Sequence, residues 1–112
     1  MLGFILKLIL SGIAAVFISR FIPGITVASI TDGVLLALVL ALLNAIVRPI
    51  LVFLTIPITI LTLGLFLLVI NIIIIYLADA ILDGFDVQNV LSALIFSLIL
   101  SVITAIIDFA RK

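Results

Sequence analysis

The sequence predicts an all-α integral membrane protein, a bundle of four transmembrane helices built from two tandem helical hairpins in parallel orientation. Composition is the first observation behind this prediction. Of the 112 residues 69% are hydrophobic and 9% are charged, and the mean hydropathy is +1.85, far from the composition of an ordinary soluble domain. The second observation is an internal repeat at an offset of sixty residues, which predicts duplicated architecture.

The repeat preserves a turn and a ladder of small residues. The turn Gly24-Ile25-Thr26-Val27 matches Gly84-Phe85-Asp86-Val87. Small residues four apart allow close packing of membrane helices, so we expect the ladder to serve helix packing and association between copies. We assign repeat one to about residues 1–52 and repeat two to about 61–112, within a single membrane domain, 1–112. The ladder consists of Gly33, Ala37, Ala41 and Ala45 in the first copy, and of Ala93, Ser97, Ser101 and Ala105 in the second.

Four apolar spans fit the chain, because one span needs about 20 mostly apolar residues. The first is predicted at 2–19 and the last at 90–107. Between them, an apolar stretch that follows Gly33 and runs to residue 78 would measure roughly 67 Å as one helix, about twice the ~30 Å hydrocarbon core. The stretch must therefore fold back. Proline disfavours helix continuation, so Pro49 and Pro57 are predicted helix breaks.

We place the inner bend between Leu54 and Thr59. The second span then begins near Gly33 and extends at least to Val47, and the third occupies 59–80. A removable signal peptide is the competing interpretation of the first span. It is disfavoured because that span has a counterpart in the third, and cleavage would leave half a repeat unpaired.

Basic residues predict the orientation, since lysine and arginine favour the cytoplasmic side of short loops. Only Arg20 falls at the opposite end, together with most of the aspartates. Both termini are therefore predicted to be cytoplasmic. The basic residues on the cytoplasmic side are Lys7, Arg48, Arg111 and Lys112.

Reactive chemistry is scarce in this chain. It contains no cysteine and no histidine, and its formal net charge is zero, so thiolate or imidazole chemistry and a nucleic-acid footprint are not expected. Four spans also leave no room for a soluble catalytic domain. We predict that the protein is not an enzyme and uses no metal or cofactor.

Polar residues inside the spans are the candidate functional residues. Asn44 and Arg48 are four apart and share a helix face. The favoured interpretation is that Arg48 marks the end of a span and reaches into the headgroups. The alternative is a polar site in which Arg48 binds a lipid phosphate or another anion and Asn44 orients it. Asn71, near the middle of the third span, could line a polar pathway, but a hydrogen bond to a neighbouring helix is the favoured interpretation.

Several motifs together resemble a bacterial family. They are Asn44 with Arg48-Pro49, then Ile56-Pro57-Ile58, Leu61-Thr62-Leu63-Gly64 and Asn71. In this order and spacing the chain resembles the YvlD-like four-span membrane proteins, also called mycobacterial-type phage holins, superfamily IV. The resemblance implies a multi-pass protein of the bacterial cytoplasmic (inner) membrane with no established enzymatic activity.

Two functional classes follow. The favoured one is a non-catalytic envelope component that contacts membrane lipids and forms homo-oligomers or binds a protein partner of unknown identity. The alternative is a holin-type pore or lesion former. A polar stripe that includes Ser97 and Ser101 could face a pore between copies, but the first ladder is mainly alanine, so packing explains both copies and a pore explains one.

Overall fold

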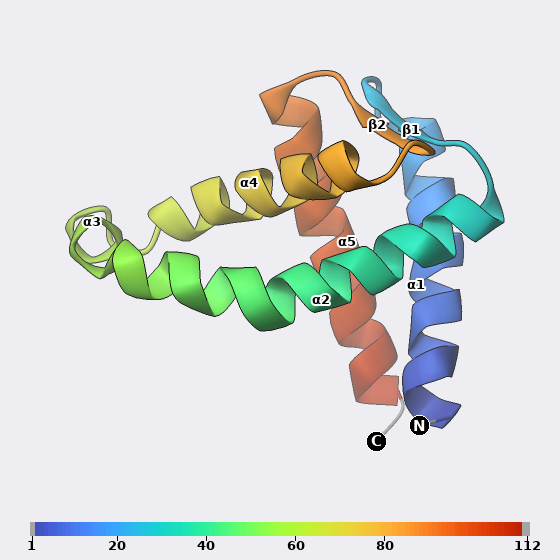
Figure 1. Ribbon diagram of the computed structural model, residues 1–112, viewed down its shortest axis with the longest axis horizontal. Coiled ribbons are helices and arrows are strands. Elements are labelled where there is room, and N and C mark those ends of the chain that lie inside the picture. The colour runs from blue at the N-terminus through green and yellow to red at the C-terminus, as the bar shows by residue number, and fades with distance from the viewer. Residues whose placement is uncertain (1, 111–112) are drawn as a thin grey trace.

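The computed structural model describes residues 2–110 and contains five helices and two short strands within that range. The predicted basic end, Arg111 and Lys112, lies outside the described residues. Figure 1 shows the helices crossing one another, with both strands at one end of the molecule. The elements in chain order are α1 (Leu2–Phe21), β1 (Ile25–Val27), α2 (Ile30–Leu54), α3 (Ile56–Leu61), α4 (Phe66–Ile81), β2 (Phe85–Val87) and α5 (Val90–Ala110).

Three of these helices, α1, α2 and α5, are long and apolar enough to cross a membrane, and α4 is a shorter apolar helix. Helix α1 packs against α2 and α5, and α4 also packs against α2 and α5. Within residues 2–110, no Cα atom of α1 lies within 8 Å of a Cα atom of α4, and the same holds for α2 and α5. The four helices therefore form a ring around a central axis.

The strands tie the two outer turns together. They pair antiparallel, and Thr26 faces Asp86, the residue sixty positions later. Flanking bonds match at the same offset: Ala28 donates to the Gly84 carbonyl (2.9 Å) and Gln88 donates to the Gly24 carbonyl (2.7 Å). This is the register that a two-fold axis between the strands would produce.

Helices α2 and α5 begin with side-chain caps. The Ser29 hydroxyl accepts a bond from the Asp32 backbone at 3.2 Å, and the Asn89 amide oxygen accepts one from Ser92 at 2.8 Å. Such oxygens satisfy backbone donors that a first helical turn leaves free. The second span therefore starts at Ile30, before the predicted Gly33.

Helix α1 crosses α2 at two glycines. A Cβ atom added to Gly12 would lie 2.5 Å from the Val34 backbone nitrogen, and one added to Gly33 would overlap the Gly12 carbonyl oxygen. Both contacts are with backbone, so the two helices approach as closely as they do because neither position has a side chain.

The structure corrects two expectations about the middle of the chain. Helix α2 continues through Pro49 to Leu54, so Pro49 does not break it; membrane helices tolerate an interior proline where other groups satisfy the freed carbonyl. The expected third span, 59–80, is divided into α3 and α4. Pro57 lies in the first turn of α3, where its missing donor costs no helical hydrogen bond.

Candidate functional site

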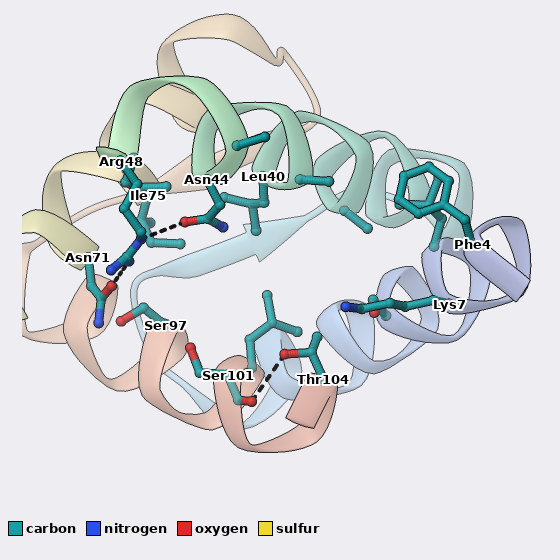
Figure 2. Close-up of a pocket in the computed structure, with 17 residues that line it drawn as sticks. Phe4, Lys7, Leu40, Asn44, Arg48, Asn71, Ile75, Ser97, Ser101 and Thr104 are labelled. Carbon is teal, nitrogen blue, oxygen red and sulfur yellow. Dashed lines mark hydrogen bonds between the residues drawn. The ribbon is translucent and has the colours of Figure 1, made fainter. Parts of the chain in front are cut away.

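A pocket of about 400 Å³ lies inside the ring of four helices. Figure 2 shows Arg48, Asn44 and Asn71 on one side of it, and Lys7 pointing in from the opposite side. Every helix of the ring contributes to the lining. The lining residues are Phe4, Lys7, Leu8 and Ser11 of α1; Ala37, Leu40, Ala41, Asn44, Ala45 and Arg48 of α2; Asn71, Ile74 and Ile75 of α4; and Ser97, Leu100, Ser101 and Thr104 of α5.

Arg48 is held by two amide oxygens. Its Nε donates to Oδ1 of Asn44 at 2.9 Å, within α2, and its Nη2 donates to Oδ1 of Asn71 on α4. The sequence placed Asn44 and Arg48 on one face, and the structure adds Asn71 to them. An amide oxygen accepts a hydrogen bond but carries no net charge, so these two partners orient the guanidinium without neutralising it.

Arg48 is also placed differently from an arginine that ends a span. It lies six residues before the end of α2, and its side chain is half-buried and turned toward the neighbouring helix α4. The contact with Asn71 corresponds to the interhelical bond considered for that asparagine. Within the described residues, the side-chain partners of Arg48 are the two asparagines of the pocket lining, Asn44 and Asn71.

Lys7 supplies a second cation on the far side of the pocket. Its Nζ lies 2.8 Å from Oδ2 of Asp108, so this ion pair links the first helix to the last. Both side chains keep substantial exposure, 31% and 46%, and such partly exposed pairs contribute little stability. Two cationic side chains, Lys7 and Arg48, therefore line the pocket, and one carboxylate, that of Asp108, lies beside Lys7.

Ser11 has the one buried side-chain oxygen within residues 2–110 that lacks a hydrogen-bond partner. It lines the pocket from α1 and is 5% exposed. Other lining hydroxyls bond to their own helix: Ser97 donates to the Leu94 carbonyl and Thr104 donates to that of Ser101, each at 3.0 Å. Since buried polar groups are normally paired, the Ser11 hydroxyl is a lining group whose hydrogen-bonding capacity is unused within residues 2–110.

The small-residue ladder has two roles along its length. Gly33, Ala37, Ala93 and Ser97 are buried, whereas Ala41, Ala45 and Ser101 face the pocket and Ala105 is exposed. Near the strands the ladder lets helices approach one another, and further along it leaves the pocket open. The ladder therefore faces mainly the inside of one chain.

The pocket is closed toward the strands. Toward the strands, each helix of the ring contributes one fully buried residue to the hydrophobic core; we call these four residues the closed layer. Its members are 0% or 1% exposed, so the pocket ends within the bundle. The closed layer consists of Ala15, Leu36, Ala78 and Phe96.

The predicted site did not include Lys7 or Ser11, and Thr104 was predicted only as part of the polar stripe with Ser97 and Ser101. Lys7 and Ser11 are four residues apart, as Asn44 and Arg48 are, and this spacing alone would have placed them on one helix face.

Within residues 2–110 no group of three or more acidic, histidine or cysteine side chains could hold a metal ion. The arrangement is suited to binding an anion by charge and hydrogen bonds.

These features define the class of protein, a multi-pass helical membrane protein with a polar pocket inside its bundle. The chain belongs to the family described as mycobacterial 4 TMS phage holin, superfamily IV, which matches residues 2–106. This confirms the resemblance seen in the sequence.

Two relatives support the assignment. The uncharacterized membrane protein YvlD of Bacillus subtilis (strain 168) is 32% identical over 109 residues, which cover 96% of this chain and 92% of that protein. An uncharacterized protein of Streptomyces coelicolor is 39% identical over 75 residues, covering 63% of this chain and 60% of that protein. No solved structure matches the chain.

Proposed function

We propose that this protein is a non-catalytic membrane component that binds the phosphate group of a membrane lipid in its pocket, through Arg48. The observation that carries the proposal is the pairing of Arg48 with two neutral amides. A charged side chain within a membrane helix costs about 2.5 to 3.5 kcal/mol at the bilayer centre. A bound anion would offset that cost, and a guanidinium matches phosphate oxygens in a two-pronged geometry.

The lining favours a lipid as the source of the phosphate. Phe4, Leu8 and the pair Ile74 and Ile75 provide apolar surface beside the polar groups, as in ligand sites where a few polar groups fix orientation. The Ser11 hydroxyl and the Lys7 ammonium are further donors for phosphate oxygens. An amphiphile satisfies both parts of this lining, whereas inorganic phosphate satisfies only one.

Native mass spectrometry of protein extracted gently from bilayers tests the proposal. We expect a retained phospholipid on the parent protein and at least about tenfold weaker retention in Arg48→Ala, the effect of losing about 1.4 kcal/mol. Arg20→Ala is the matched control, because Arg20 is exposed at the last turn of α1. Equal retention by Arg48→Ala and the parent would overturn the proposal. Delipidated protein that takes up inorganic phosphate but no phospholipid would reassign the source.

We also propose the finer architecture: two tandem hairpins in parallel orientation, with both termini on the cytoplasmic side of the bacterial inner membrane. The register of Thr26 with Asp86 and the matched flanking bonds support the duplication. The ion pair of Lys7 with Asp108 supports placing both ends of the chain on one side. Association between copies is retained in the proposal, and its surface would be on the outward helix faces, because the ladder faces mainly inward.

A pore former is the second candidate, because the family description names phage holins. The closed layer means that one chain encloses no continuous channel, so a pore would have to form between copies. Release of trapped dye from vesicles distinguishes the two candidates.

A further inference from the structure

The connection between α2 and α4, residues 55–65, has the properties of a segment buried in lipid. No charged residue lies between Arg48 and Asp79. The large side chains of the connection point outward, with Leu61 83% exposed and Leu63 94% exposed. A turn in water would ordinarily carry polar residues, so this exposed apolar surface calls for an apolar environment.

The backbone donors at the end of this connection, from Thr62 onward, are satisfied from within. Every backbone N–H from Thr62 to Leu68 donates to a nearby carbonyl or hydroxyl oxygen, at 2.8 to 3.1 Å. Among these bonds, Gly64 donates to the Thr59 carbonyl across the turn, where Leu63 and Gly64 take positive φ of 57° and 90°. Water is not needed to satisfy these donors, which is the condition for placing backbone in a bilayer.

The hydroxyl groups of the connection are satisfied in the same way. Thr55 donates to the Leu51 carbonyl at 2.7 Å. Thr62 donates to the Ile58 carbonyl at 3.0 Å and accepts from the Phe66 backbone at 3.1 Å. Bonds of this kind remove the penalty for taking a hydroxyl out of water.

The position of the connection agrees with its chemistry. Figure 1 shows α3 at the tip of the arm formed by α2 and α4, at a level between the strands and the chain ends. Helix α4 has 16 residues and measures about 24 Å, less than the ~30 Å hydrocarbon core. If its Asp79 end lies at one surface, its other end does not reach the opposite surface.

We propose that residues 55–65 lie within the bilayer, in contact with lipid acyl chains, and do not form a water-exposed turn. This placement is independent of anion binding, because it rests on a different segment. It makes the arm of α2, α3 and α4 a lipid-contacting surface beside the pocket.

The chain has no cysteine, so single spin labels test this placement directly. A label at Leu63→Cys in vesicles should collide more often with oxygen, which partitions into hydrocarbon, than with a water-soluble nickel complex. Gln88→Cys, on an exposed site of the outer turn, is the control and should show the reverse. Greater collision with the nickel complex at Leu63→Cys would overturn the proposal, and a second label at Leu61→Cys guards against a local effect of one substitution.

Discussion

At the scale of single residues, polar groups around the pocket are satisfied to different degrees. Arg48 has hydrogen-bond partners but no counter-charge among them, since Asn44 and Asn71 offer amide oxygens. Ser11 is buried without a partner among residues 2–110. A site that is complete in the absence of a ligand would show neither feature.

Ser11→Ala should separate binding from folding. An unpaired buried hydroxyl costs free energy, so its removal should leave the thermal unfolding midpoint of delipidated protein unchanged or higher. The same change should weaken phospholipid retention, because it deletes an unpaired hydroxyl from the pocket lining. Loss of stability with unchanged retention would contradict the role given to Ser11.

At the scale of elements, the α1–α2 crossing depends on two glycines whose backbones meet. Gly12→Ala would bring a methyl group against Val34 backbone atoms at 2.5 and 2.7 Å. Backbone cannot move aside as a flexible side chain can, so the helices must separate.

We expect Gly12→Ala to destabilise the fold by about 1 to 3 kcal/mol, the usual cost of overpacking. The measurement is unfolding in mixed micelles of mild and denaturing detergent. Val102→Ile adds a methylene at a position on α5 that is 59% exposed and should have almost no effect. Equal stabilities of the two variants would contradict the close approach.

Ala41→Leu tests the part of the ladder that faces the pocket. The larger side chain should fill the space beside Arg48 and reduce phospholipid retention, while helix content and stability stay close to those of the parent. Leu42→Phe, on an exposed position of the same helix, is the control for added bulk. If Ala41→Leu instead disrupted the fold and left retention intact, the ladder would be a packing device at this position too.

Local sequence signals predicted some elements well and others poorly. The apolar runs predicted the first and last spans to within three residues at each end, whereas the strands and the division of the third span were missed. Strand pairing joins turns that are sixty residues apart, and no local pattern reports it. The break before α4 depends on positive φ at Leu63 and Gly64, a leucine being an uncommon residue in that conformation.

The site divides in the same way. Asn44 and Arg48 could be paired from their spacing, because residues four apart share a helix face whatever the rest of the fold does. The contact of Arg48 with Asn71 depends on how α4 is rotated about its axis in the ring. The placement of Lys7 and Ser11 in the pocket lining depends in the same way on the rotation of α1. That rotation comes from contacts such as the glycine crossing, which a span prediction does not contain.

At the scale of the whole molecule, the ring of helices encloses the pocket and has a buried core toward the strands. The closed layer separates the pocket from the strands, and the aromatic rings of Phe85 and Phe96 pack beside one another there with centroids 5.6 Å apart. This arrangement favours a binding pocket over a channel within one chain.

Reconstituted vesicles should therefore retain trapped dye. We expect release no faster than from protein-free vesicles at low and high protein density, and the same for Ala41→Leu. Release that rises with protein density and with decreasing dye size would favour the pore former instead, with the conducting surface between copies.

If a phospholipid occupies the pocket, its phosphorus atom lies close to the Arg48 guanidinium, and this proximity can be measured. The protein is labelled with ¹⁵N-arginine and reconstituted in phosphorus-free glycolipid with one equivalent of phosphatidylglycerol. Solid-state NMR then measures the ³¹P–¹⁵N dipolar coupling at each arginine. Arg20→Lys and Arg111→Lys variants assign the other two arginine signals. We predict coupling at one arginine signal, and the loss of that signal in Arg48→Lys assigns it to Arg48. Absence of coupling at Arg48 while the phospholipid remains in the same bilayer would contradict the account.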